Sequence, residues 1–336
     1  MAESITTAPP RLDLLERQGP RLSARSWPLH AALFLLTIVT TTLAGVALTP
    51  TEVVQTEPPL ATPVDYLLYI PLVFFQFLVT VVRDAVFHPH LLASGIAFSA
   101  SLLAILFSHE MGHYLACRYY KVDATLPYFI PAPPMFLAGT FGAFIKIRSP
   151  IPSRRALFDI GLAGPLAGFV VALPLAIVGV LTVGPPQAPQ DGVIFFNDPL
   201  LFRLIAKAAG MPLDPNAPIN PYYMAAWIGL LVTSLNLMPV GQLDGGHGIF
   251  AIFGPRAHKL IGRLAFVTVT VLAVLGFWLH GSPSGFLYAI LIAIMLKLPH
   301  PQPVAMEPLG TKRIIIAMVT LIVFALCFLP FPITIT

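Results

Sequence analysis

The sequence predicts an all-α polytopic membrane protein, on the evidence of its composition and of the long apolar blocks along it. Of its 336 residues, 57% are hydrophobic and only 10% are charged, whereas soluble domains carry about 25% charged residues. Lysines and arginines gather at the ends of the apolar blocks, which is typical of membrane orientation signals and not of a nucleic-acid-binding face. We therefore expect a lipid bilayer, and no nucleic acid, as a partner.

Seven apolar blocks have the length and composition of membrane-spanning helices, which need about 20 apolar residues. The first block follows a basic N-terminal tail and is too long for the core of a cleaved signal peptide, so we expect a retained signal anchor. Basic residues place that tail and the loop at 117–155 on the cytoplasmic side. The predicted spans are 30–49, 93–115, 158–183, 222–242, 261–280, 283–298 and 313–330.

The apolar run at 66–82 conflicts with this topology. If 30–49 leaves the cytoplasm and 93–115 returns to it, nothing can cross the membrane in between. We therefore expect 66–82 to be an interfacial or re-entrant element. The alternative is that it spans and that the N-terminal tail lies outside, against the charge rule.

The stretch 123–150 differs from the apolar blocks around it. Its first half is rich in proline, which excludes a continuous helix, and its second half alternates Thr, Phe and Ile after Gly139. This pattern predicts a short β-strand or hairpin at the inner membrane surface. An open strand edge cannot face lipid unpaired, so the edge must lie in protein or water, or be completed by another chain.

The motif with the clearest chemistry is His109-Glu110-Met111-Gly112-His113. On a helix, positions i and i+4 share a face, so both imidazoles can bind one Zn²⁺ while the glutamate acts as general base toward water. Glu110 alone among the glutamates lies within an apolar segment, where a charge is costly and indicates function. The alternatives are a polar trio that packs two helices, or histidines that ligate haem.

Two histidines leave a catalytic zinc site one protein ligand short. The best candidate for the third ligand is Asp244 in the run Asn236 to Gly246, because the preceding apolar block brings it to the depth of His113. Gly245 and Gly246 would permit the tight chain reversal that this needs. Alone, Asp-Gly is also an ordinary turn signal.

Three further features lie near these residues. Asn236 could bind a substrate carbonyl or oxyanion, or form an ordinary interhelical hydrogen bond. His247 adjoins the predicted ligand turn and is expected to be exposed or to lie behind the ligands. The glycines between Gly161 and Gly168 predict close helix packing and not catalysis.

Together these motifs resemble the site-2 protease family of intramembrane metalloproteases, in the branch that lacks a PDZ domain. The resemblance covers about 93–250 and includes the H-E-x-x-H motif, the Gly139–Ala143 strand, Gly161 to Pro165, and Asn236 to Gly246. It implies a three-helix metalloprotease core (93–115, 158–183 and 222–242) with flanking transmembrane helices. The extra element at 60–90 departs from a minimal core, and its role as a gate or substrate guide is open.

The resemblance also implies roles for the residues. His109, His113 and Asp244 would bind one Zn²⁺, Glu110 would be the acid/base, and Asn236 would contact substrate. The 139–148 strand would hold an unwound substrate segment by strand addition. The four expected parts are a cytoplasmic tail (1–29), a signal anchor with an interfacial element (30–92), the protease core (93–250) and C-terminal transmembrane helices (251–336).

The sequence therefore predicts an intramembrane zinc endopeptidase that cleaves transmembrane protein substrates. A bacterial cytoplasmic membrane is the expected location, with a chloroplast membrane as the alternative. A membrane transporter and a non-catalytic zinc-bound scaffold are the competing functions; repeated halves with broken helices, frequent in transporters, are not evident in the sequence.

Overall fold

Nine helices and two small antiparallel sheets make up the part of the chain that the computed structural model describes, residues 27–48, 62–186, 194–214 and 216–335. Most of the predicted tail at 1–29 lies outside these residues. The helices are α1 (Trp27–Ala47), α2 (Pro63–Phe87), α3 (Pro89–Tyr119), α4 (Arg154–Leu181), α5 (Leu200–Ala208), α6 (Pro221–Asn236), α7 (Asp244–His280), α8 (Ser284–Lys297) and α9 (Thr311–Cys327). The strands are β1 (Tyr128–Pro131), β2 (Thr140–Phe144), β3 (Ile194–Phe196) and β4 (Ile333–Ile335).

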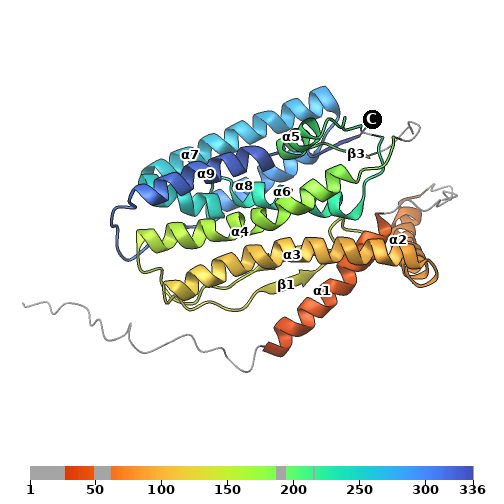
Figure 1. The fold of residues 1–336 in the computed structure, drawn as a ribbon, viewed down its shortest axis with the longest axis horizontal. Helices are drawn as coiled ribbons and strands as arrows, with labels where there is room; N and C mark the ends of the chain where they lie inside the picture. The colour runs from red at the N-terminus through yellow and green to blue at the C-terminus, as the bar shows by residue number, and fades with distance from the viewer. Residues whose placement is uncertain (1–26, 49–61, 187–193, 215, 336) are drawn as a thin grey trace, which may run out of the picture.

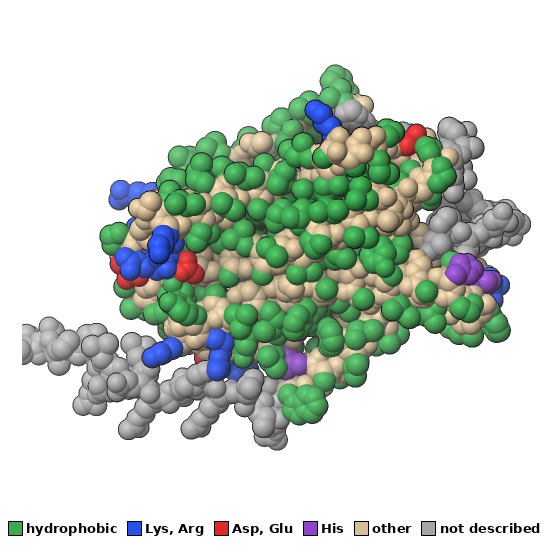
Figure 2. Space-filling view, viewed as in Figure 1, with side chains coloured by type: hydrophobic (Ala, Val, Ile, Leu, Met, Phe, Trp, Pro, Cys, Tyr) green, Lys and Arg blue, Asp and Glu red, His purple; other side chains and the backbone are tan. Residues whose placement is uncertain are grey.

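The predicted fold class, an all-α polytopic membrane protein, is confirmed. Five helices among the described residues are long and apolar enough to cross a membrane: α1, the Tyr69–Phe87 part of α2, α3, α4 and α7 up to Leu279. Hydrophobic side chains cover most of the face shown in Figure 2, and charged side chains gather toward its ends. Such an apolar girdle suits a lipid environment and would be a liability in water.

The centre of the molecule is formed by α3, α4 and α6, each of which contacts the other two. In Figure 1, α3 and α4 run side by side, α1 crosses beside α3, and α7 and α9 lie on the far side of α4. Trp227, Phe98 and Phe158, which are among the largest fully buried side chains, come one from each of the three central helices. These helices correspond to the three-helix core that the sequence predicts.

The α1–α3 contact is made backbone to backbone at two glycines. A Cβ on Gly95 would lie 2.5 Å from the carbonyl oxygen of Thr42, and one on Gly45 would lie 2.9 Å from the Cα of Gly95. Only glycine allows this approach, the usual device for close packing of transmembrane helices. Beside the glycines, Thr41 and Ser99 share a buried hydrogen bond of 2.6 Å.

One ion-pair cluster fastens α9 to the central helices near the end of α3. The Arg313 guanidinium donates two hydrogen bonds to the Asp159 carboxylate, at 2.9 and 2.6 Å, and a third to the Tyr120 hydroxyl at 2.9 Å. Tyr120 in turn donates to Asp159. The paired geometry makes this arrangement more specific than a single surface ion pair.

The predicted helix at 222–242 is too long. α6 ends at Asn236, and residues 237–243 form a turn before α7 begins at Asp244. Pro239 explains the early end, because proline cannot continue the hydrogen-bond ladder and disfavours helix in the residue before it. α7 also begins earlier than the predicted span at 261–280, with a kink at Gly254 (φ 80°) before Pro255.

The predicted β element is a hairpin. β1 and β2 pair antiparallel, with Tyr128 opposite Phe144, Phe129 opposite Ala143, and an irregularity before Pro131. β1 packs on α1, and β2 lies next to α3. Within the described part of the chain, β2 has β1 as its one partner strand.

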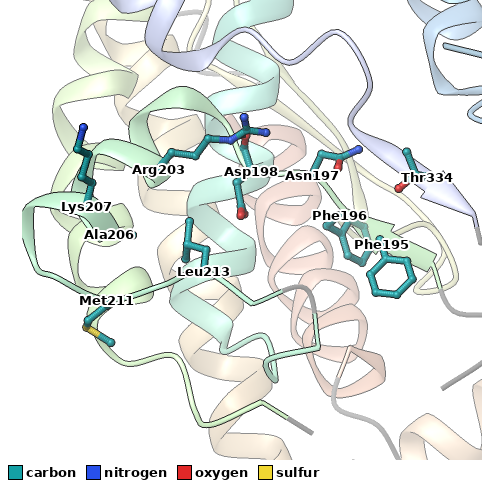
Figure 3. A pocket seen from close by; sticks show the side chains of 10 residues that line it. All are labelled: Phe195, Phe196, Asn197, Asp198, Arg203, Ala206, Lys207, Met211, Leu213 and Thr334. Atoms are coloured by element: carbon teal, nitrogen blue, oxygen red, sulfur yellow. The ribbon is translucent and has the colours of Figure 1, made fainter. Parts of the chain in front are cut away.

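A second sheet joins two segments that lie far apart in the sequence. β3 pairs with β4, with Phe195 opposite Thr334. This sheet and α5 line a pocket of about 640 Å³, which is shown in Figure 3. Asp198 and Arg203 are two of the charged residues that line it. Burial raises the pKa of the Asp198 carboxyl, against the opposing effects of a hydrogen bond from Tyr223 and the charge of Arg203. Asn197, one of the residues that line the pocket, accepts a hydrogen bond on its backbone carbonyl from the indole N–H of Trp227 on α6.

α2 is one continuous helix that passes through Pro71, and it lies at the end of the molecule where α3 begins (Figure 1). It contacts α1 and α3, and many of its apolar side chains are exposed. Its length and composition would let it cross a membrane, which the charge rule did not lead us to expect. The interfacial placement of 66–82 stays a prediction.

The α1–α3 contact generates a test of the packing. We expect Gly95→Leu to force α1 away from α3 and to cost about 1–3 kcal/mol of stability, as overpacking does. Thermal unfolding in detergent measures it. Ala93→Leu is the matched control, since Ala93 is exposed on the same helix two residues earlier, and it should unfold like the parent protein. Equal unfolding temperatures for the two variants would contradict the packing described here.

Candidate metal centre

Two of the three converging side chains come from one buried face of α3. His109 and His113 are four residues apart and therefore lie one above the other. Their Nε2 atoms are 3.1 Å apart, and both residues are buried. The helix alone thus supplies a pair of aligned nitrogen ligands.

The third side chain comes from the first turn of α7. The Oδ2 atom of Asp244 lies 3.3 Å from Nε2 of His109 and 3.4 Å from Nε2 of His113. The turn that brings it there is tight: a Cβ on Gly245 would lie 2.0 Å from the Leu237 carbonyl oxygen, and one on Gly246 would lie 2.6 Å from that of Gly241. The glycines after Asp244 are therefore needed for the chain to reverse.

The three ligand atoms form a triangle that fits a tetrahedral zinc ion. Zinc binds imidazole and carboxylate at about 2.0–2.2 Å, which puts neighbouring ligand atoms about 3.3 Å apart at the tetrahedral angle. The observed sides of 3.1, 3.3 and 3.4 Å match this spacing. Among the described residues, this is the one cluster of three histidine, cysteine or acidic ligands close enough to hold a metal ion.

α4 forms the wall behind the histidines. The Ile160 carbonyl oxygen is 2.7 Å from Nδ1 of His113, so it can accept a hydrogen bond from the Nδ1–H group. Nε2 is then free for a metal, the usual arrangement behind a ligating histidine. A Cβ on Gly164 would lie 2.1 Å from Nε2 of His113, and one on Gly168 would lie 3.2 Å from Cβ of His109. The glycines predicted to pack helices thus pack against the histidines themselves.

Asn236, the last residue of α6, also faces the triangle. Its Nδ2 atom lies 3.3 Å from Nε2 of His109. The structure therefore brings together all the site residues singled out from the sequence: His109, Glu110, His113, Asn236 and Asp244.

Glu110 is buried on α3, next to His109 in the chain. Its carboxylate interacts with the backbone N–H of Ile145, which directly follows β2. The acidic residue of the motif is thus in contact with the β element predicted to bind substrate.

His247 lies outside the triangle. Its Nδ1 is 2.9 Å from Nε2 of His300, and its backbone is one turn after Asp244. Three contributors to the surroundings of the site were not predicted from the sequence: the Ile160 carbonyl, the space at Gly164, and His300. None has a local motif, although the small residues at 161–168 were a signal for a close approach.

An H-E-x-x-H helix and an aspartate from a distant glycine turn, both set in apolar helices, define the class of membrane-embedded metallopeptidase-type proteins. The peptidase family M50 model matches residues 97–279, just over half of the chain. The chain therefore belongs to peptidase family M50.

Named relatives agree with this assignment. The chain is 33% identical over 312 residues to the "probable zinc metalloprotease EGY1, chloroplastic" of Arabidopsis thaliana, a match of 89% of this chain and 52% of the relative. It is 31% identical to the rice (japonica) EGY1 protein, covering 89% and 49%, and 29% identical to Arabidopsis EGY2, covering 73% and 44%. The chain thus spans about half the length of these relatives. No solved structure matches.

The contact at Gly164 predicts a specific loss of metal. We expect Gly164→Ala to displace the His113 ring and to weaken zinc retention about tenfold or more, the lower end of the effect of disturbing a ligand's support. Zinc content after dialysis against graded chelator measures it. Gly168→Ala, whose Cβ meets His109 only at 3.2 Å, should lose less. Parent-like zinc retention by Gly164→Ala would show that His113 is not held as described.

Proposed function

We propose that the chain is an intramembrane zinc endopeptidase that hydrolyses peptide bonds within or near transmembrane segments of membrane protein substrates. The observation that carries this proposal is the triangle of two imidazoles and one carboxylate, with Glu110 beside it, set in helices that are long and apolar enough to span a membrane. Membership of peptidase family M50 supports the reaction class.

In this proposal His109, His113 and Asp244 hold one zinc ion. When bound, zinc acts as a Lewis acid and lowers the pKa of water toward about 7. Glu110 takes a proton from the attacking water and passes it to the leaving nitrogen. The burial of Glu110 and its place next to the ligand His109 in the chain support this role.

Asn236 is proposed to contact the substrate in the same step. Nε2 of His109 cannot bind a metal and accept a hydrogen bond from Asn236 at once, because it has a single lone pair. A metal ion bound at that atom would leave the Asn236 amide free, and we propose that this amide donates to the substrate carbonyl as negative charge develops on its oxygen.

β2 is the proposed cradle for substrate. A helical carbonyl is already hydrogen-bonded, so a transmembrane substrate must unwind before it can be cut, and its freed backbone groups need partners. β2 can supply them by strand addition, and its neighbour Ile145 contacts Glu110. Strand addition at this edge would bring the substrate backbone next to the general base.

We propose a membrane location for the chain. A multi-pass membrane protein is supported by the apolar helices. Of the two membranes expected from the sequence, only the chloroplast membrane agrees with the names of the relatives, and nothing among them supports the bacterial cytoplasmic membrane. Transmembrane proteins of the membrane in which the chain resides are the proposed substrates.

Glu110→Gln separates the proposed peptidase from its alternatives. We expect the variant to retain zinc and to lose peptidase activity by about 10²–10⁴-fold, the usual contribution of a general base. The assay uses the purified protein with a helical membrane substrate, and zinc content is measured on the same samples.

The other outcomes are equally definite. Zinc bound by both forms with no cleavage by either would favour the scaffold. Ion flux that is lost with Glu110→Gln would favour a transporter. Loss of zinc along with activity would contradict the role of Glu110 as a base that is not a ligand.

Strand addition predicts that the backbone N–H groups of the substrate contribute to its binding. A substrate peptide with N-methyl groups on alternate residues beside the scissile bond loses the N–H donors of a ladder while keeping its side chains. We expect KM to rise at least about tenfold when the methylated positions face β2, in line with about 1–1.5 kcal/mol for a hydrogen bond. Shifting the methyl groups by one residue is the control, since those N–H groups point away. Equal KM values for both peptides would count against strand addition.

A further inference from the structure

Three histidines outside the metal triangle form a second cluster. His247 and His258 lie on α7, and His300 lies in the connection between α8 and α9. The His300 ring stacks on Phe250, with centroids 4.2 Å apart and planes 6° apart, and meets the edge of the His258 ring at 4.7 Å. Packed against both rings, His300 is held in one orientation.

The hydrogen bonds of His300 fix where the protons sit. Nδ1 of His300 is 2.7 Å from the Pro301 carbonyl oxygen, which can only accept, so Nδ1 carries the proton. Burial, together with the nearness of the His247 and His258 rings, lowers the pKa of His300 to about 3, so the ring is neutral and its Nε2 is an acceptor. Nδ1 of His247, 2.9 Å away, must therefore be the donor. One carbonyl thus sets the tautomers of two histidines in sequence.

The α8–α9 connection that carries His300 is tied to both sides of the site. Gln242, in the turn before Asp244, donates to the Pro299 carbonyl at 2.7 Å. Further along, the backbone N–H groups of Val304 and Ala305 donate to the carbonyls of Ile151 and Pro152, just before α4. The connection therefore spans from the start of α7 to the start of α4.

His247 connects His300 to the helices that carry the metal triangle. A Cβ on Gly161 would lie 2.8 Å from Cβ of His247 and 3.4 Å from the Asp244 carbonyl oxygen, so the first turn of α7 packs on α4 at this residue. The residue before it, Ile160, is the one whose carbonyl faces His113. The His247 ring therefore stands where the helix of the carboxylate ligand meets the helix that orients a histidine ligand.

We propose that His300 is a positioning residue of the metal site, which acts through His247 to hold Asp244 and α4 in register. The inference rests on the metal site of the proposed function. It adds a contribution from beyond residues 97–279, the range that the family model covers. In this role His300 needs no contact with metal or substrate.

The test uses the full-length protein and two variants. His300→Phe keeps a flat ring against Phe250 but removes the acceptor, and we expect zinc to dissociate about tenfold or more faster into a chelator, with kcat reduced and KM little changed. His300→Gln keeps an acceptor for His247 and should recover most of the retention. His90→Phe, an exposed histidine on α3, is the matched control and should behave like the parent.

A metal-free measurement keeps the outcome separate from catalysis. Nitrogen NMR of histidine-labelled protein without zinc should show His247 protonated on Nδ1 in the parent and in His300→Gln, and a mixture of tautomers in His300→Phe. Assignment uses the His247→Asn variant. A failed peptidase assay for the parent would overturn the proposed function without touching this result.

Two outcomes would overturn the inference. One is zinc dissociation from His300→Phe at the parent rate. The other is an unchanged His247 tautomer in that variant. If His300→Phe unfolds at a much lower temperature than the parent, the comparison of His300→Gln with His300→Asn decides instead. The shorter side chain should not reach His247 and should lose zinc faster, and equal rates would overturn the proposal.

Discussion

The close contact between α3 and α4 is the constraint on which the metal site depends. Two imidazoles inside an apolar bundle are stable only where their hydrogen-bonding atoms are satisfied, because lipid and packed hydrocarbon offer no partner. α4 meets this need with the Ile160 carbonyl, and it comes close enough only because Gly164 leaves room for the His113 ring. The same approach is seen from α3, where a Cβ on Gly112 would lie 2.4 Å from the Ala163 carbonyl oxygen.

The second requirement is a carboxylate delivered from a different helix at the same depth. Here the chain ends α6 at Asn236, turns within seven residues and starts α7 at Asp244. An aspartate in the first turn of a helix sits at the positive end of the helix dipole, which favours its charged form. The two ends of one turn thus supply an amide, from Asn236, and a carboxylate, from Asp244, beside His109.

Much of this arrangement was predictable from the sequence because it is local. The spacing of His109 and His113 is a helix period, and the breaker residues around Asp244 mark a turn without reference to any partner. The hairpin at 128–144 was signalled by proline and by alternation. The fold class followed from the composition and from the long apolar blocks, since few charges and helix-length apolar segments leave little choice.

The rest depended on contacts between segments far apart in sequence. Nothing near Ile194 indicates that it pairs with a strand at the other end of the chain. His300 has no motif, and its place beside His247 becomes visible only once α7 and the α8–α9 connection are packed together. The end of α6 was misjudged because hydropathy continues past Asn236, while Pro239 breaks the helix. An apolar composition shows which segments can lie in lipid, but it does not show where the backbone turns.

The most direct measurement of the central claim is X-ray absorption at the zinc edge on the purified protein. Two imidazoles and a carboxylate predict a first shell of nitrogen and oxygen at about 2.0–2.2 Å, with the outer-shell scattering of two histidine rings. The signal of one ring should be lost in His113→Ala. A shell that contains sulfur, or a spectrum without two ordered imidazoles, would contradict the site described here.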